Sequence, residues 1–108
     1  MDFRFEAELI EWRGPAPYYF LPIPPEMVDA VREVAADVTY GWGMVPVEAT
    51  IGASSWETSL WPREGGYLLP VRKWVQKAQT MDVGETATVG MRVVSRGGRA
   101  ANGTGPTM

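Results

Sequence analysis

The chain has 108 residues, enough for one domain with its own hydrophobic core and too few for two. It contains neither Cys nor His, which excludes disulfides, thiolate or imidazole catalysis, and the usual zinc, haem and iron–sulfur sites. The net charge of −3 makes nucleic acid an unlikely partner, because affinity for phosphates depends on Lys and Arg.

The first part of the chain predicts two strands and a helix. Apolar and polar residues alternate over residues 3–9, the period of a strand with one face on a core. A second strand is predicted over residues 18–21, and it ends at Pro22. From Pro24 onward the apolar residues follow helical spacing, which predicts an amphipathic helix over residues 27–35.

The second part predicts a hairpin, a short strand, another helix and a last strand. Residues 45–51 and 56–61 both alternate and form the hairpin, with Gly between them. A short apolar strand follows over residues 67–69, and helical spacing covers residues 71–78. Alternation over residues 87–93 predicts the sixth strand.

The register of the hairpin is open from the sequence. A two-residue turn at positions 52–53 sets Glu48 directly opposite Glu57, and opposed like charges are unfavourable. A four-residue loop over positions 52–55 sets Glu48 opposite Ser59 instead. Both registers put the apolar faces of the two strands on the same side.

The chain is predicted to divide into a single domain over residues 1–94 and a flexible tail over residues 95–108. The tail is rich in Gly, has no acidic residue and has almost no apolar residue that could dock on a core.

Two segments have nearly the same pattern, and this repeat predicts the architecture. Residues 19–22 (YFLP) and 67–70 (YLLP) each run into a helical pattern and then into an alternating strand. A strand-helix-strand unit that occurs twice favours pseudo-twofold symmetry, with equivalent strands interleaved. We therefore predict a mainly β fold: a small closed or partly open six-stranded β-barrel with two short helices at its ends. An open sheet with both helices on one face is the alternative.

Several short motifs resemble those of a known family. They are Gly41-Trp42-Gly43, Ile51-Gly52, Trp56-x-Thr58-Ser59-Leu60-x-Pro62, Gly65-Gly66-Tyr67-Leu68-Leu69-Pro70-Val71-x-Lys73 and Val83-Gly84-Glu85. With them, residues 3–94 are similar to the family catalogued as domain of unknown function nineteen-oh-five. The resemblance implies a compact β-barrel with two short helices, found alone or fused to a bacteriocin-protection (OmpD-associated) type domain. It implies no settled activity. Trp61 and Arg72 stand where this family leads us to expect Phe and Lys.

Aromatic and basic residues are the candidates for a ligand site. The candidate ligand-binding residues are Trp42, Trp61, Tyr67, Arg72 and Lys73. Trp61 lies on the face that its strand otherwise gives to polar residues, and Arg72 and Lys73 follow soon after the next loop. We expect these three side chains to meet at the rim of one pocket. Trp56 and Trp74 are expected to fill the core.

The weaker candidates for catalysis are Glu48, Glu57 and Tyr67. Two opposed glutamates are one way in which proteins build a general acid, and a tyrosine hydroxyl can donate a proton. No serine has a recognisable base in its neighbourhood, so a serine nucleophile is not expected. No phosphate-binding loop or metal-binding loop occurs, and we expect neither a cofactor nor a metal.

The leading hypothesis is a non-enzymatic binding or interaction module whose aromatic pocket takes a small ligand or a peptide. The alternative is a cofactor-free isomerase or cyclase acting on an apolar small molecule, and a nucleic-acid-binding regulator is the third candidate. An ionisable side chain that points into the pocket among the aromatic residues, a buried carboxylate above all, would favour the enzyme, since most acid–base catalysts need a carboxylate and a binding module does not. A homo-oligomer is also considered, because acidic residues crowd the first helix and basic residues the second.

The same sequence features predict a cytoplasmic protein. No run approaches the ~18 apolar residues of a membrane helix, so the membrane is not an expected partner. The absence of Cys suits a reducing compartment, and the first residues lack the basic and apolar regions of a signal peptide.

Overall fold

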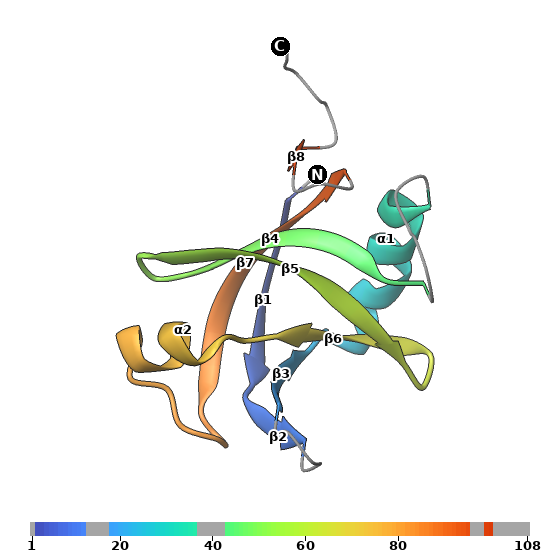
Figure 1. The fold of residues 1–108 in the computed structure, drawn as a ribbon. Helices are drawn as coiled ribbons and strands as arrows, with labels where there is room; N and C mark the ends of the chain where they lie inside the picture. The colour runs from blue at the N-terminus through green and yellow to red at the C-terminus, as the bar shows by residue number, and fades with distance from the viewer. Residues whose placement is uncertain (1, 13–17, 37–42, 96–98, 101–108) are drawn as a thin grey trace.

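The computed structural model describes residues 2–12, 18–36, 43–95 and 99–100. Strands dominate these residues, and two short helices interrupt them (Figure 1). In chain order the elements are β1 (Asp2–Glu8), β2 (Ile10–Trp12), β3 (Tyr18–Pro22), α1 (Pro25–Ala35), β4 (Val45–Ile51), β5 (Ser54–Arg63), β6 (Gly66–Pro70), α2 (Lys73–Ala78), β7 (Thr86–Ser95) and β8 (Arg99–Ala100).

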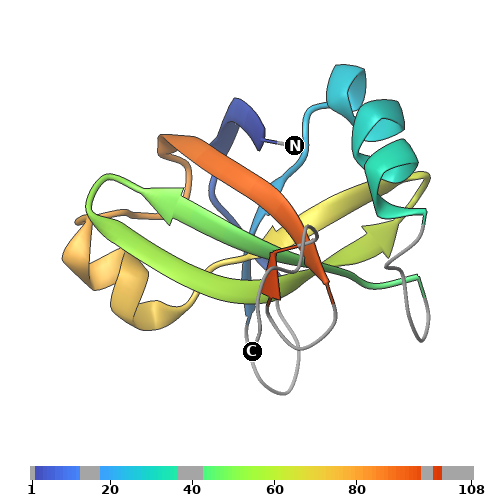
Figure 2. The ribbon, with the colours of Figure 1, turned by 90° about the horizontal axis from the view of Figure 1, so that it is seen from above.

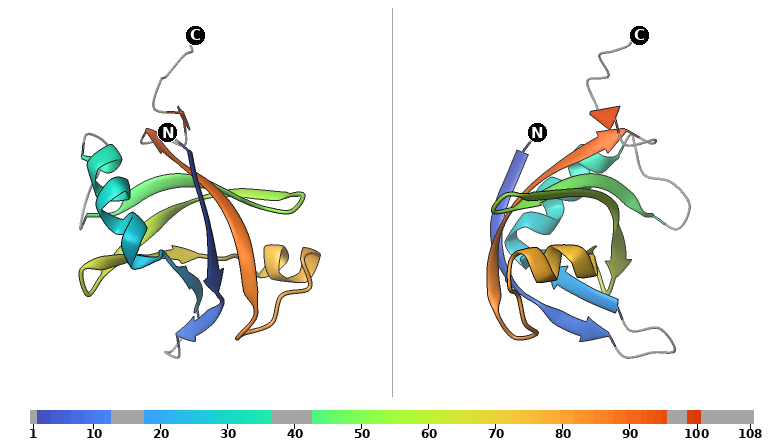
Figure 3. Two further views of the ribbon diagram at one scale, coloured as in Figure 1. Left: turned by 180° about the vertical axis from the view of Figure 1, so that it is seen from behind. Right: turned by 60° about the vertical axis from the view of Figure 1, so that its left-hand side comes forward.

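The strands form one antiparallel sheet that curls into an open half-barrel (Figures 1 and 3). Its order is β1-β7-β4-β5-β6-β3-β2, and β8 pairs only with β7. The mainly β class is therefore confirmed, and of the two predicted forms the curl agrees with the partly open barrel, whereas the closed form and the number of six strands are wrong. The additional strand on this path is β2, which the sequence does not predict because residues 10–12 break the alternation of residues 3–9.

The sheet bends at two places, between β1 and β2 and within β5. The chain turns from β1 into β2 at Leu9, whose N–H donates to the carbonyl of Glu85 at 2.9 Å and whose carbonyl accepts from Gly84 at 2.8 Å. β5 turns in the same way, because its residues 54–60 pair with β4 and its residues 61–63 pair with β6. Bends of this kind let one strand belong to two halves of a sheet.

The sequence repeat corresponds to an approximate twofold axis. β3 pairs with β6, and Leu21 lies directly opposite Leu69, its equivalent in the repeat. The amide two residues after each leucine donates to the tyrosine carbonyl of the other copy, at 3.0 Å (Ile23 to Tyr67) and at 2.9 Å (Val71 to Tyr19). β4 pairs with β7 in the same manner. Equivalent strands are thus interleaved, in agreement with the prediction.

The structural unit is longer than the repeat that the sequence displays. When the two copies are exchanged, the strand pairings match: β1 beside β7 corresponds to the first part of β5 beside β4, and β2 beside β3 corresponds to the last part of β5 beside β6. Leu9 and Leu60 occupy the two corners, and both are fully buried. Each unit therefore consists of a bent strand, a short strand, a helix and a last strand.

The helices lie at opposite ends of the curl (Figure 2), so the alternative with both on one face of an open sheet is wrong. α1 starts with Pro25 and buries Val28, Val31 and Ala35 in the common core. α2 has only 6 residues, and Val75 is its buried residue. The prediction that Trp74 fills the core is wrong, because so short a helix turns only Val75 inward and leaves Trp74 49% exposed.

The hairpin between β4 and β5 has the two-residue turn. Glu48 lies opposite Glu57, and Gly52 adopts a φ of +57°, as the first central residue of a type II′ turn requires. A Cβ atom at Gly52 would also come within 2.5 Å of the Gln79 side chain at the end of α2. Gly52 is therefore needed both for the turn and for the close approach of α2.

The predicted tail over residues 95–108 lies mainly outside the described residues. Within the described part, Ser95 ends β7, and Arg99–Ala100 forms β8 by pairing with Val94 and Ser95. None of the helices in the described residues has the length and apolar character needed to cross a bilayer.

Candidate functional site

A pocket of about 370 Å³ opens at the corner of β5, opposite the chain that runs from β6 into α2. We call it the aryl pocket, because aromatic rings form much of its wall. It is lined by Tyr18, Tyr19, Thr58, Trp61, Pro70, Val71, Arg72 and Lys73. The predicted meeting of Trp61, Arg72 and Lys73 around one pocket is thus found in the structure.

Trp61 packs against two other aromatic rings. Its ring centroid is 5.1 Å from that of Phe20 and 5.5 Å from that of Tyr18. Phe20 is buried, whereas Trp61 is 38% exposed and Tyr18 is 49% exposed. Tilted aromatic pairs at this separation are favourable, so the Trp61 ring is held in place while one side stays open to the pocket.

The charged side chains of the aryl pocket are both cations. Arg72 Nη2 donates to the carbonyl of Glu57 at 3.2 Å, which fixes the guanidinium without neutralising it. Neither Arg72 nor Lys73 has a carboxylate within ion-pair distance among the described residues, where the ion pairs join other side chains. A chain with a net charge of −3 therefore carries a locally positive pocket.

A second hollow lies beside the aryl pocket, along α2. Tyr19 and Lys73 line both spaces, and Lys77 adds another cation to the second one, which has a volume of about 610 Å³. Asp82 is at its far end, beyond α2.

The structure places the other aromatic candidates elsewhere. Tyr67 is buried in the core, lies 5.9 Å below the guanidinium of Arg32, and lines a hollow of about 440 Å³ that is separate from the aryl pocket. Tyr67, a predicted ligand-binding residue, therefore does not share the aryl pocket with Trp61, Arg72 and Lys73. Trp42 lies outside the described residues. Trp56 is buried as predicted, and its Nε1 donates to the carbonyl of Pro70 at 3.0 Å, behind the pocket wall.

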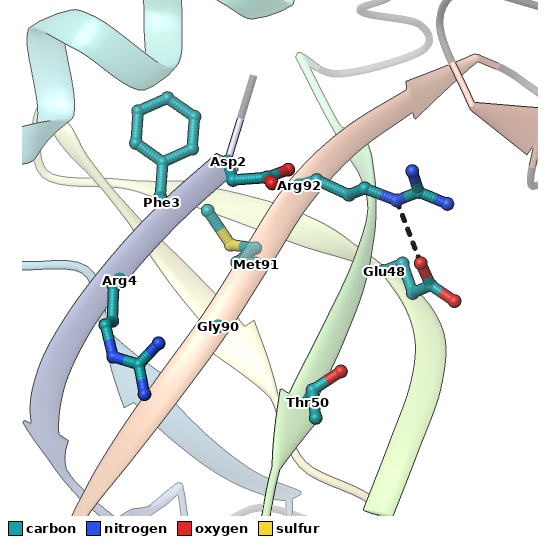
Figure 4. A pocket seen from close by; sticks show the side chains of 8 residues that line it. All are labelled: Asp2, Phe3, Arg4, Glu48, Thr50, Gly90, Met91 and Arg92. Atoms are coloured by element: carbon teal, nitrogen blue, oxygen red, sulfur yellow. Dashed lines mark hydrogen bonds and ion pairs between the residues drawn. The ribbon is translucent and has the colours of Figure 1, made fainter.

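The candidate acid–base residues Glu48 and Glu57 lie on the outer face of the sheet. Glu48 has Glu57 opposite it on one side and Arg92 opposite it on the other. Arg92 Nε donates to Glu48 Oε1 at 2.9 Å (Figure 4). The cation from β7 thus offsets the repulsion between the two glutamates that the turn at Gly52 imposes.

Figure 4 shows the shallow hollow of about 310 Å³ beside this ion pair, with Arg4 and Thr50 on either side of Gly90. Gly90 leaves space there, because a Cβ atom at this position would meet nothing within 4 Å. Glu48 lines this hollow together with residues of β1, β7 and β4, and neither Glu48 nor Glu57 is among the residues that line the aryl pocket.

Replacing Arg92 by Gln is expected to lower the free energy of unfolding by up to about 1 kcal/mol, because Glu48 then faces Glu57 without a cation. The effect is small because the Arg92 and Glu48 side chains are 47% and 36% exposed. Chemical denaturation measures it. Adding Glu57→Gln to the Arg92→Gln variant should recover most of the loss, and no recovery would contradict this explanation.

Tyr18 and Tyr19 are pocket residues that we did not single out from the sequence. They reach the pocket because β3 pairs with β6 in a register that sets Phe20 opposite Pro70. The signal that could have identified them is the repeat itself, since equivalent strands beside one another bring the start of β3 to the end of β6.

No group of three or more Asp and Glu residues in the described ranges is arranged to hold a metal ion. A family model, described as Domain of unknown function (DUF1905), matches residues 5–91. The matched residues run from within β1 into β7 and include all the residues that line the aryl pocket. No curated protein matches the chain.

Proposed function

Because the chain belongs to the DUF1905 family, whose description names no activity, we propose its function from the aryl pocket: a non-enzymatic binding module for a small ligand or a short peptide. The observation that carries this proposal is Trp61, a large aromatic side chain that is held by Phe20 and Tyr18 and stays open to a pocket. Rigid, half-exposed aromatic residues supply binding energy at a low entropic cost. The volume of about 370 Å³ lies in the range of ligand sites.

The composition of the pocket wall supports binding over acid–base catalysis. No carboxylate is among the described residues that line it, and its charged groups are Arg72 and Lys73. Glu48 and Glu57 lie on the outer face instead. An isomerase or cyclase that moves protons needs a base and an acid beside its substrate, and the glutamates are not placed to serve.

Trp61→Ala tests the proposal. We expect the free energy of unfolding to fall by less than the roughly 3–5 kcal/mol of a buried tryptophan, because the ring is partly exposed. We also expect the loss of binding in a ligand-observed NMR screen of small aromatic compounds and short aromatic peptides, and the loss of any small molecule seen with the purified protein by native mass spectrometry.

Trp74→Ala is the matched control. Trp74 is 49% exposed and does not line the aryl pocket, so this variant should keep the binding of the parent protein. Two results would refute the proposal: Trp61→Ala unfolds the domain, which would make Trp61 a core residue, or it leaves binding unchanged.

A further inference from the structure

The two copies of the repeat differ at the start of their helices. Pro70 and Val71 correspond to Pro22 and Ile23, but the next two residues are Arg72 and Lys73 in the second copy and two prolines, Pro24 and Pro25, in the first. The aryl pocket draws on both copies, because Tyr18 and Tyr19 come from β3 of the first copy. The pair of cations in its wall occurs in the second copy alone.

The two cations do not help α2 to form. Proline suits the first position of a helix, and α1 has it there. Acidic side chains suit the first turn, whereas α2 starts with basic residues and has no acidic residue in its first turn. Residues that go against the preferences of a helix start without stabilising the helix are often present for a functional reason.

The same side chains face the pocket without a negative partner. Arg72 is held by the carbonyl of Glu57 at 3.2 Å, and the described residues provide no ion pair for it or for Lys73. A guanidinium and an ammonium beside a pocket complement a carboxylate. Across the pocket, the Trp61 and Tyr18 rings, tilted by 55° to one another, provide an aromatic wall for an apolar body.

We infer that the ligand of the aryl pocket is a small aromatic acid, whose ring lies against Trp61 and Tyr18 and whose anionic group binds Arg72 and Lys73. This inference rests on the proposed function and adds the charge of the ligand to it. A volume of about 370 Å³ fits one small molecule, which favours a free acid over a peptide.

The experiment compares acids with their neutral amides. The probes are indole-3-acetate with indole-3-acetamide, and 2-naphthoate with 2-naphthamide, titrated into the full chain while the indole N–H signal of Trp61 is followed by NMR. The members of a pair have nearly the same shape, so a difference in affinity reports the charge. We expect each acid to bind at least about tenfold more tightly than its amide, and the difference to shrink as salt is added.

A double variant with Arg72→Gln and Lys73→Gln should remove the preference for the acid while leaving the affinity for the amide unchanged. The matched control is Lys77→Gln, which removes an exposed cation of α2 that lines the neighbouring hollow and not the aryl pocket. This control should keep the preference. Thermal unfolding of the parent protein, the double variant and the Lys77→Gln variant shows whether all three remain folded.

Four results would overturn the inference. The amides bind as tightly as the acids; the preference survives in the double variant; Lys77→Gln removes it equally; or an acidic aromatic peptide such as acetyl-Glu-Trp-Glu-amide shifts the Trp61 signal while the free acids do not. If the acids, the amides and the peptide all leave this signal unchanged, the proposed function fails together with the inference, which is a different result from equal binding.

Discussion

Replacing Trp56 by alanine is expected to lower the free energy of unfolding by about 3–5 kcal/mol. Trp56 is 5% exposed and belongs to the core between the two halves of the sheet. Its truncation leaves a large cavity and removes the hydrogen bond of 3.0 Å to the carbonyl of Pro70. Equilibrium denaturation in urea, followed by far-ultraviolet circular dichroism, measures the loss.

The other tryptophans provide the comparison for this prediction. Trp61→Ala and Trp74→Ala should each cost clearly less, because both side chains are more than a third exposed. Trp56→Phe keeps most of the buried area and should cost about 1 kcal/mol for the lost hydrogen bond, together with a small packing term. If Trp56→Ala were as mild as Trp74→Ala, the placement of Trp56 in the core would be wrong.

Leu21→Ala and Leu69→Ala are expected to be similarly severe, at about 2–5 kcal/mol each. Both leucines are fully buried, and they face each other where β3 pairs with β6. The approximate twofold axis passes between them, so their surroundings are alike and the two losses should agree within about 1 kcal/mol. Thermal and chemical denaturation of the two variants test this agreement.

The double variant sharpens the test. Neighbouring residues rarely give additive effects, because the two truncations enlarge one shared space. We expect the loss in the double variant to differ from the sum of the single losses by more than about 0.5 kcal/mol. Additive losses, or a single variant that is nearly as stable as the parent, would show that the two leucines do not share an environment.

Much of the fold follows from patterns within short stretches of the sequence. Alternation predicts β1, both strands of the central hairpin and β7, and the repeat predicts that equivalent strands are interleaved, as the pairs β3–β6 and β4–β7 show. β2 is not predicted, because the bend at Leu9 interrupts the alternation. Trp74 is placed wrongly, because helical spacing extends the apolar stripe over a helix that starts only at Lys73.

The register of the hairpin shows a limit of another kind. From the hairpin alone, Glu48 opposite Glu57 is unfavourable, and nothing nearby compensates for it. The compensation comes from Arg92, 44 residues further along the chain. A register that depends on a third strand can be decided only once the order of the strands is known.

The candidate site could be predicted only in part, because some of its residues are brought together by strands that are distant in the sequence. The face of Trp61 and the positions of Arg72 and Lys73 are visible in neighbouring stretches of sequence, and the three meet in the aryl pocket. The position of Tyr67 depends on which face of β6 turns toward the core. Its ring is on the buried side, whereas the tyrosines that reach the pocket come from β3.

Strands that lie beside their own equivalents across an axis are the arrangement of two identical chains in a symmetric dimer. The protein therefore has the layout of two half-length subunits joined into one chain, as gene duplication and fusion would produce. In such an ancestral dimer every binding site must occur twice. Fusion removes this constraint, since each half can then mutate by itself, and Arg72 with Lys73 against Pro24 with Pro25 is a difference of this kind. A single asymmetric pocket is accessible only to the fused chain.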